Sequence, residues 1–188
     1  MNKDDLEIIP GIKLGKYRLD WDLDTLIRNL PDNYTVWNGC FDFWEVLFDD
    51  CKYSIRIRKY DSKITSIQVW DKFRSPLEEH FKGKIKRGST HEEVELELEL
   101  EFGEIVGFDD SVYLPQYPGM AFDFDGDDEE NDDDDDSWKK YRFSRIYVYR
   151  LDEPEDDKTY KNYTCLQKPC PFPKDKVENP HRKSEKGT

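Results

Sequence analysis

The stretch GKIKRGSTHEEVELELELEFG, from Gly83 to Gly103, decides the fold, because both a helix and a strand fit it. Ser89 and Glu92 have the spacing of a helix capping box, and Gly103 lies where a helix commonly ends. The apolar residues nevertheless alternate with glutamate, which is the period of a strand: Val94, Leu96, Leu98, Leu100 and Phe102. The caps, the glutamate and leucine content and a match with an earlier segment favour the helix.

That earlier segment is GIKLGKYRLDWDLDTLIRNL, from Gly11 to Leu30. Both segments hold an isoleucine between two glycines and continue into an acidic and apolar stretch. In the earlier one, four residues at helical spacing form one apolar face: Leu23, Leu26, Ile27 and Leu30. Pro31 and Asp32 then end the predicted helix. The two helices lie at corresponding places in two halves of the chain.

Each predicted helix is followed by runs rich in β-branched and aromatic residues. The first is followed by FWEVLF, YSIRIRKY and ITSIQVW, and the second by DSVYL, GMAFDF and YRFSRIYVYR. We therefore predict an α+β fold of two tandem repeats, in which each helix is followed by an antiparallel β-sheet. The repeats are expected at residues 1–75 and 76–151, with an acidic hairpin loop at 125–137. Residues 152–188 are expected to form a mostly irregular tail.

The pattern G-x-I-x-x-G-S-T-x-E-E-V, from Gly83 to Val94, resembles the small module of the SmpA/BamE outer-membrane assembly lipoproteins. Two such modules in tandem are similar to the β-lactamase-inhibitor protein architecture, and the resemblance covers roughly residues 8 to 150. The first copy departs from the pattern, because it has extra residues before its helix. The resemblance implies a fold that presents a concave sheet to a protein partner. A lipoprotein role is not implied, since no lipoprotein cysteine lies near Met1.

The stretch DFDGDDEENDDDDDSW, from Asp123 to Trp138, holds eleven carboxylates and no lysine or arginine. These eleven account for all but three of the fourteen net negative charges of the chain. Such a run repels nucleic acid and anionic membranes and suits a basic protein surface, and nearby aromatic rings could anchor that partner. The predicted partner-binding residues are Asp123, Asp125, Asp127, Asp128, Glu129, Glu130, Asp132, Asp133, Asp134, Asp135, Asp136, Tyr117, Phe124 and Trp138. The alternative is a solvated loop without a partner.

The sequence offers little for catalysis or metal binding, so we predict a protein that is not an enzyme and has no cofactor. Known nucleophile, zinc and phosphate-loop motifs are absent from the sequence, although Cys40 could meet His80 or His91 in space. An EF-hand register fails for a calcium loop starting at Asp123 or Asp125. Without an export signal at the N-terminus, the four cysteines are expected to be reduced thiols in the cytoplasm.

These features together predict an immunity protein, an antitoxin that binds and blocks a cognate bacterial toxin. A nuclease is the favoured toxin, because a nuclease carries a basic groove that an acidic, aromatic surface can occupy. The expected complex is one monomer with one toxin, without direct contact to nucleic acid or membrane. The alternative is a regulatory or scaffold domain, also not an enzyme, that docks a basic protein partner.

Overall fold

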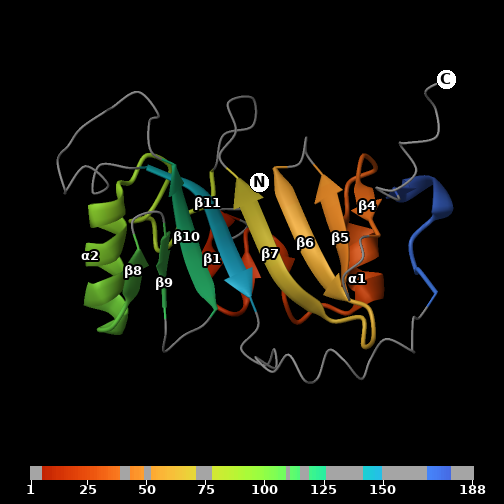
Figure 1. The fold of residues 1–188 in the computed structure, drawn as a ribbon, viewed down its shortest axis with the longest axis horizontal. Coiled ribbons are helices and arrows are strands. Elements are labelled where there is room, and N and C mark those ends of the chain that lie inside the picture. The colour runs from red at the N-terminus through yellow and green to blue at the C-terminus, as the bar shows by residue number, and fades with distance from the viewer. Residues whose placement is uncertain are drawn as a thin grey trace.

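The computed structural model describes residues 6–38, 43–48, 52–70, 78–108, 111–114, 119–125, 142–149 and 169–178. A nine-stranded sheet dominates it, in the order β12-β4-β5-β6-β7-β11-β10-β9-β8, and a small sheet of β1, β2 and β3 lies behind it (Figure 1). The strands are β1 (Ile8–Ile9), β2 (Lys13–Leu14), β3 (Tyr17–Arg18), β4 (Thr35–Trp37), β5 (Phe43–Phe48), β6 (Tyr53–Arg58), β7 (Ile64–Trp70), β8 (Val106–Phe108), β9 (Ser111–Tyr113), β10 (Met120–Asp125), β11 (Arg142–Tyr149) and β12 (Val177–Glu178). The helices are α1 (Leu23–Asn29), α2 (His91–Phe102) and the short 3-10 helix η3 (Lys174–Lys176).

The predicted fold class, two helix-then-sheet repeats, is wrong. Strands from both halves of the chain form a single large sheet, because β7 and β11 pair with each other and join the strands on either side. The parallel pairing of β12 with β4 makes this sheet mixed. Strands predominate, and the described part of the chain contains only two α-helices. The repeat boundaries at 75/76 and 151/152 stay predictions, since both fall outside the described residues.

The stretch from Gly83 to Gly103 contains helix α2, as its caps indicated. The N-cap is Thr90 and not Ser89: the Thr90 hydroxyl accepts a hydrogen bond from Glu93 N–H, and the Glu93 carboxylate accepts one from Thr90 N–H at 2.9 Å. The Ser89 hydroxyl instead accepts a hydrogen bond from Lys86 N–H. Gly103 ends the helix with a φ of 87°, a conformation that favours glycine.

Helix α1 also lies where its apolar spacing predicted. It begins after Asp22, whose carboxylate accepts a hydrogen bond from Thr25 N–H at 2.6 Å. Leu26 is fully buried, and Leu23, Ile27 and Leu30 are partly buried against the core. The predicted apolar face is therefore the face that packs inward.

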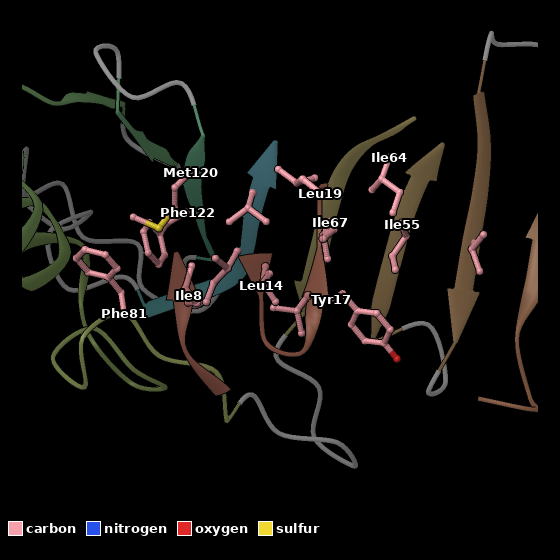
Figure 2. Close-up of a cluster of buried hydrophobic side chains, with 14 of the residues drawn as sticks. Ile8, Leu14, Tyr17, Leu19, Ile55, Ile64, Ile67, Phe81, Met120 and Phe122 are labelled. Carbon is pink, nitrogen blue, oxygen red and sulfur yellow. The ribbon is translucent and has the colours of Figure 1, made fainter. Parts of the chain in front are cut away.

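The hydrophobic core lies between the small sheet and the large one. Ile8, Leu14 and Tyr17 of the small sheet face Ile55 and Ile67 of the large sheet (Figure 2). The turn between β1 and β2 is also hydrogen-bonded to the residue before β10, because Gly11 N–H donates to the Gly119 carbonyl at 3.0 Å. Ile8 N–H donates to the His80 carbonyl at 2.8 Å, which ties the start of the chain to the segment before α2.

Candidate partner-binding face

The side chains of the large sheet alternate between two faces, one packed on the core and one open. Directly paired residues share a face, so the register identifies the open one: Glu45 pairs with Arg56, Trp70 with Arg145, and Arg145 with Asp123. Figure 1 is viewed from this side, with the small sheet behind. We name this surface the open face and define it by six residues: Glu45, Arg56, Trp70, Asp123, Arg145 and Tyr147.

Asp123 and Arg145 form a hydrogen-bonded ion pair on the open face, with Arg145 Nη2 2.6 Å from Asp123 Oδ2. The Tyr147 hydroxyl donates to the same carboxylate oxygen. Burial, followed by the hydrogen bond and the negative charge of Asp123, raises the pKa of Tyr147 above its usual value of 10.0. The phenol therefore stays protonated to a higher pH than a free tyrosine and keeps its hydrogen bond to Asp123.

Aromatic rings flank the arginines of the open face. The Arg145 guanidinium carbon lies 5.6 Å from the centre of the Trp70 ring and 4.9 Å from that of Tyr147. The Arg56 guanidinium lies 5.0 Å from the Phe43 ring, and cation–π contacts at such distances are favourable. These contacts orient the two arginines across the middle of the sheet.

Arg56 is the more accessible of the two arginines. Its Nε lies 3.5 Å from the Glu45 carboxylate, at the limit of a hydrogen bond, and its side chain is 41% exposed. The same Glu45 oxygen accepts a shorter hydrogen bond, 2.6 Å, from the Ser54 hydroxyl. Because a partly exposed ion pair of this length contributes little stability, Arg56 can exchange Glu45 for a carboxylate on another molecule at small cost.

Three of the predicted partner-binding residues lie in the described part of the chain. Asp123 is bound to Arg145 and Tyr147, and Asp125 is the last residue of β10 and lies opposite Arg142 in the register. Phe124 is only 4% exposed and packs against His91 and Phe143, so its ring is not accessible to a partner. The remaining predicted residues lie outside the described residues: Tyr117, Asp127, Asp128, Glu129, Glu130, Asp132, Asp133, Asp134, Asp135, Asp136 and Trp138.

Sequence reasoning missed the residues at the centre of the open face: Arg56, Trp70, Arg145 and Tyr147. The signal for Arg56, Arg145 and Tyr147 is present in YSIRIR and RFSRIYVY, where arginine or tyrosine takes every second place beside buried isoleucine or valine. The arginines did not stand out, because outside the acidic run the positive and negative charges nearly cancel. The acidic run supplies most of the net charge of the chain.

The described residues contain no group of three histidine, cysteine, aspartate or glutamate side chains that could hold a metal ion. The Cys40 pairing with His80 or His91 cannot be placed, because Cys40 lies outside the described residues. His91 is fully buried beside the Phe124 ring, and the His80 imidazole accepts a hydrogen bond from Gly83 N–H. Within the same described ranges, the helices are too short or too polar to cross a membrane.

No protein-family model, curated protein or solved structure matches this chain. The resemblance to the SmpA/BamE module therefore rests on the motif from Gly83 to Val94, and functional inference rests on the open face itself.

Proposed function

We propose that this protein is a cytoplasmic immunity protein that binds a cognate bacterial toxin, a nuclease in the first instance, and blocks it. The open face is the observation that carries the proposal. Trp70, Tyr147 and two arginines gather at its centre, and tryptophan, tyrosine and arginine are the residues that contribute most energy to protein interfaces. Arg56 supplies accessible donors, and Trp70 supplies an aromatic anchor.

The acidic run supports the same proposal through its place in the chain. It connects β10 to β11, two paired strands that contribute Asp123, Arg145 and Tyr147 to the open face. Concentrated negative charge beside a binding face accelerates association with a basic partner. In this scheme the open face anchors the toxin, and the acidic run attracts the basic groove of the toxin.

The experiment is inhibition of the toxin domain encoded next to this gene, combined with measured association and dissociation rates. Arg56→Ala and Trp70→Ala are expected to raise the dissociation rate at least tenfold, as hot-spot residues do. Ile12→Ala is the control, since Ile12 is 43% exposed and lies on the turn between β1 and β2, beyond the opposite face of the large sheet. Changing Asp132–Asp136 to asparagine should slow association and weaken its dependence on salt.

The outcomes separate the parts of the proposal. Wild-type dissociation rates for both open-face variants would exclude this face as the contact. An unchanged salt dependence after neutralising the run would exclude steering. Absence of both binding and inhibition would exclude the immunity function, and capture of a different basic protein would favour a regulatory or scaffold domain.

A further inference from the structure

Residues 169–178 lie at the β4 end of the large sheet (Figure 1), where the strand β12 pairs with the outer edge of β4. Val177 pairs with Val36 and Glu178 with Trp37 in parallel, and Asn38 N–H donates to the Glu178 carbonyl at 3.3 Å. Residues far apart in the sequence thus complete a sheet edge. Addition of an extended segment to an exposed edge is a common way for a domain to bind a peptide.

The docked segment is anchored by side chains as well as by its backbone. Phe172 is 4% exposed, and its ring packs edge-on against Tyr34 at 6.3 Å and Trp44 at 6.2 Å. The Lys176 ammonium donates to the Asp32 carbonyl and lies 5.0 Å from the Tyr34 ring. We name the β4 edge, with Tyr34, Trp44 and the Asp32 carbonyl, the β4 groove.

The sequence of the docked segment suits an extended ligand. It reads PCPFPKDKVE from Pro169 to Glu178, with prolines on both sides of Phe172. Proline restricts φ before binding, so less chain entropy is lost when the segment docks. The groove contacts only the backbone and side chains of this short segment. Nineteen residues, 150–168, separate the segment from β11. Nothing in this recognition requires the segment and the groove to belong to the same molecule.

We propose that the β4 groove also accepts residues 169–178 of a second copy of this chain, so that two molecules exchange their C-terminal strands. A second copy is the occupant because it presents the identical segment that the groove already holds. With the connection at full length, the segment is already tethered to its own groove, so docking within one molecule is favoured over exchange in dilute protein. The proposal is independent of the immunity function.

Deletion of residues 152–168 tests the exchange. The two residues left between Tyr149 and Pro169 span at most about 11 Å, whereas β4 lies four strand spacings, about 19 Å, from β11. The segment can then dock within one molecule only if its first residues leave their native places, so exchange is favoured and the shortened chain is expected to have twice the monomer mass by light scattering. The matched control is the same deletion with Phe172→Ala, which should be monomeric. A monomeric deletion variant, or an equally dimeric control, would overturn the proposal.

A second measurement needs no deletion. A fluorescent peptide covering residues 168–179 is titrated against the full-length Phe172→Ala variant, whose own segment has lost its anchor. It should bind at least tenfold more tightly than to the wild type, where the native segment competes. The same peptide with alanine at position 172 is the control and should not bind. Equal affinity for the two proteins, or no binding to the variant, would refute the exchange.

Discussion

At the scale of single residues, Gly119 shows how closely two backbones approach where the small sheet meets the large one. A Cβ atom at Gly119 would lie 2.4 Å from the Gly11 nitrogen and 2.7 Å from its Cα. Backbone atoms cannot move aside as a flexible side chain can. The contact therefore requires glycine at position 119 for reasons of space.

Gly119→Ala is expected to lower the free energy of unfolding by about 1–3 kcal/mol, the usual cost of overpacking. Gly107→Ala is the matched control. Its Cβ would lie 2.2 Å from Oε1 of Glu95, the far end of a flexible side chain and not backbone. Urea unfolding of both variants should show a clear loss for Gly119→Ala and a change below about 1 kcal/mol for Gly107→Ala. Equal losses would contradict the close backbone contact.

Asp61 gives the molecule a pH-dependent contribution to stability. Burial raises the pKa of its carboxyl, but hydrogen bonds from the Arg58 guanidinium and Lys63 N–H, with the charges of both residues, outweigh burial. The net pKa lies below the ordinary value of 3.8. A lowered pKa stabilises the fold above pH 3.8, and this stability is lost as the pH falls through the folded-state value.

Asp61→Asn is expected to cost about 1 kcal/mol at pH 7 and progressively less below pH 3.8, because the wild-type carboxylate then becomes protonated as well. Urea midpoints at pH 7 and pH 3 measure the difference. Asp20→Asn is the control: its partner Arg18 has similar geometry, yet both side chains are largely exposed, so no measurable change is expected. A cost for Asp61→Asn that is independent of pH would contradict the linkage.

At the scale of elements, α2 separates two leucines that a strand would place together. Leu98 is fully buried, whereas Leu100, two positions later, is 70% exposed. Leu98→Ala should therefore cost about 2–5 kcal/mol and Leu100→Ala less than about 0.5 kcal/mol, as measured by thermal or urea unfolding. Similar costs for the two variants would indicate a strand in this region.

The helices show how far local sequence signals reach. Caps at both ends and high helix propensity identified α2 against its alternating pattern, and the fully buried residues of the helix recur at helical spacing: His91, Val94 and Leu98. The exact cap was missed by one residue, since Ser89 and Thr90 offer the same chemistry to glutamates one position apart. Which of the two residues caps the helix depends on the hydrogen bonds that their side chains make in the folded protein.

The strands show where local signals end. The longer strands were predictable from their β-branched and aromatic runs, but β1, β2, β3 and β12 have two residues each, too few to display a period. The local sequence of a strand also does not identify its partner: nothing in ITSIQVW or RFSRIYVY predicts that β7 and β11 pair. That one pairing turned two expected sheets into a single sheet.

At the scale of the whole molecule, the continuous sheet predicts cooperative unfolding. The described tryptophans, Trp21, Trp37, Trp44 and Trp70, all lie before residue 71, far from α2 in the sequence. In a Trp138→Phe background, Leu98→Ala should shift the urea midpoint of tryptophan fluorescence as much as that of circular dichroism. Val46→Ala, in β5, is the control from the other side of the sheet. Unequal shifts for Leu98→Ala would indicate two independently unfolding halves.

The candidate site was predictable only in part, because most of it is assembled by the folding of the whole molecule. The acidic run is contiguous in sequence and stands out in composition. The open face is assembled from β5, β6, β7, β10 and β11, so Arg56, Trp70 and Arg145 come to share one face only after the sheet has formed. The residues of a surface built by strand pairing are scattered singly along the sequence, so no contiguous stretch reveals the surface.

The β7–β11 pairing also sets the order of events during synthesis and refolding. Trp70 pairs with Arg145, seventy-five positions later in the chain, and Val36 pairs with Val177 near the C-terminus. Contacts between distant residues slow folding, because a long loop must close before the pairing stabilises anything. On the ribosome, the edge of β7 stays unpaired until β11 has been synthesised, which takes several seconds at ordinary elongation rates. During that interval the nascent chain exposes an edge to which other strands can add, and chaperone binding would protect it there.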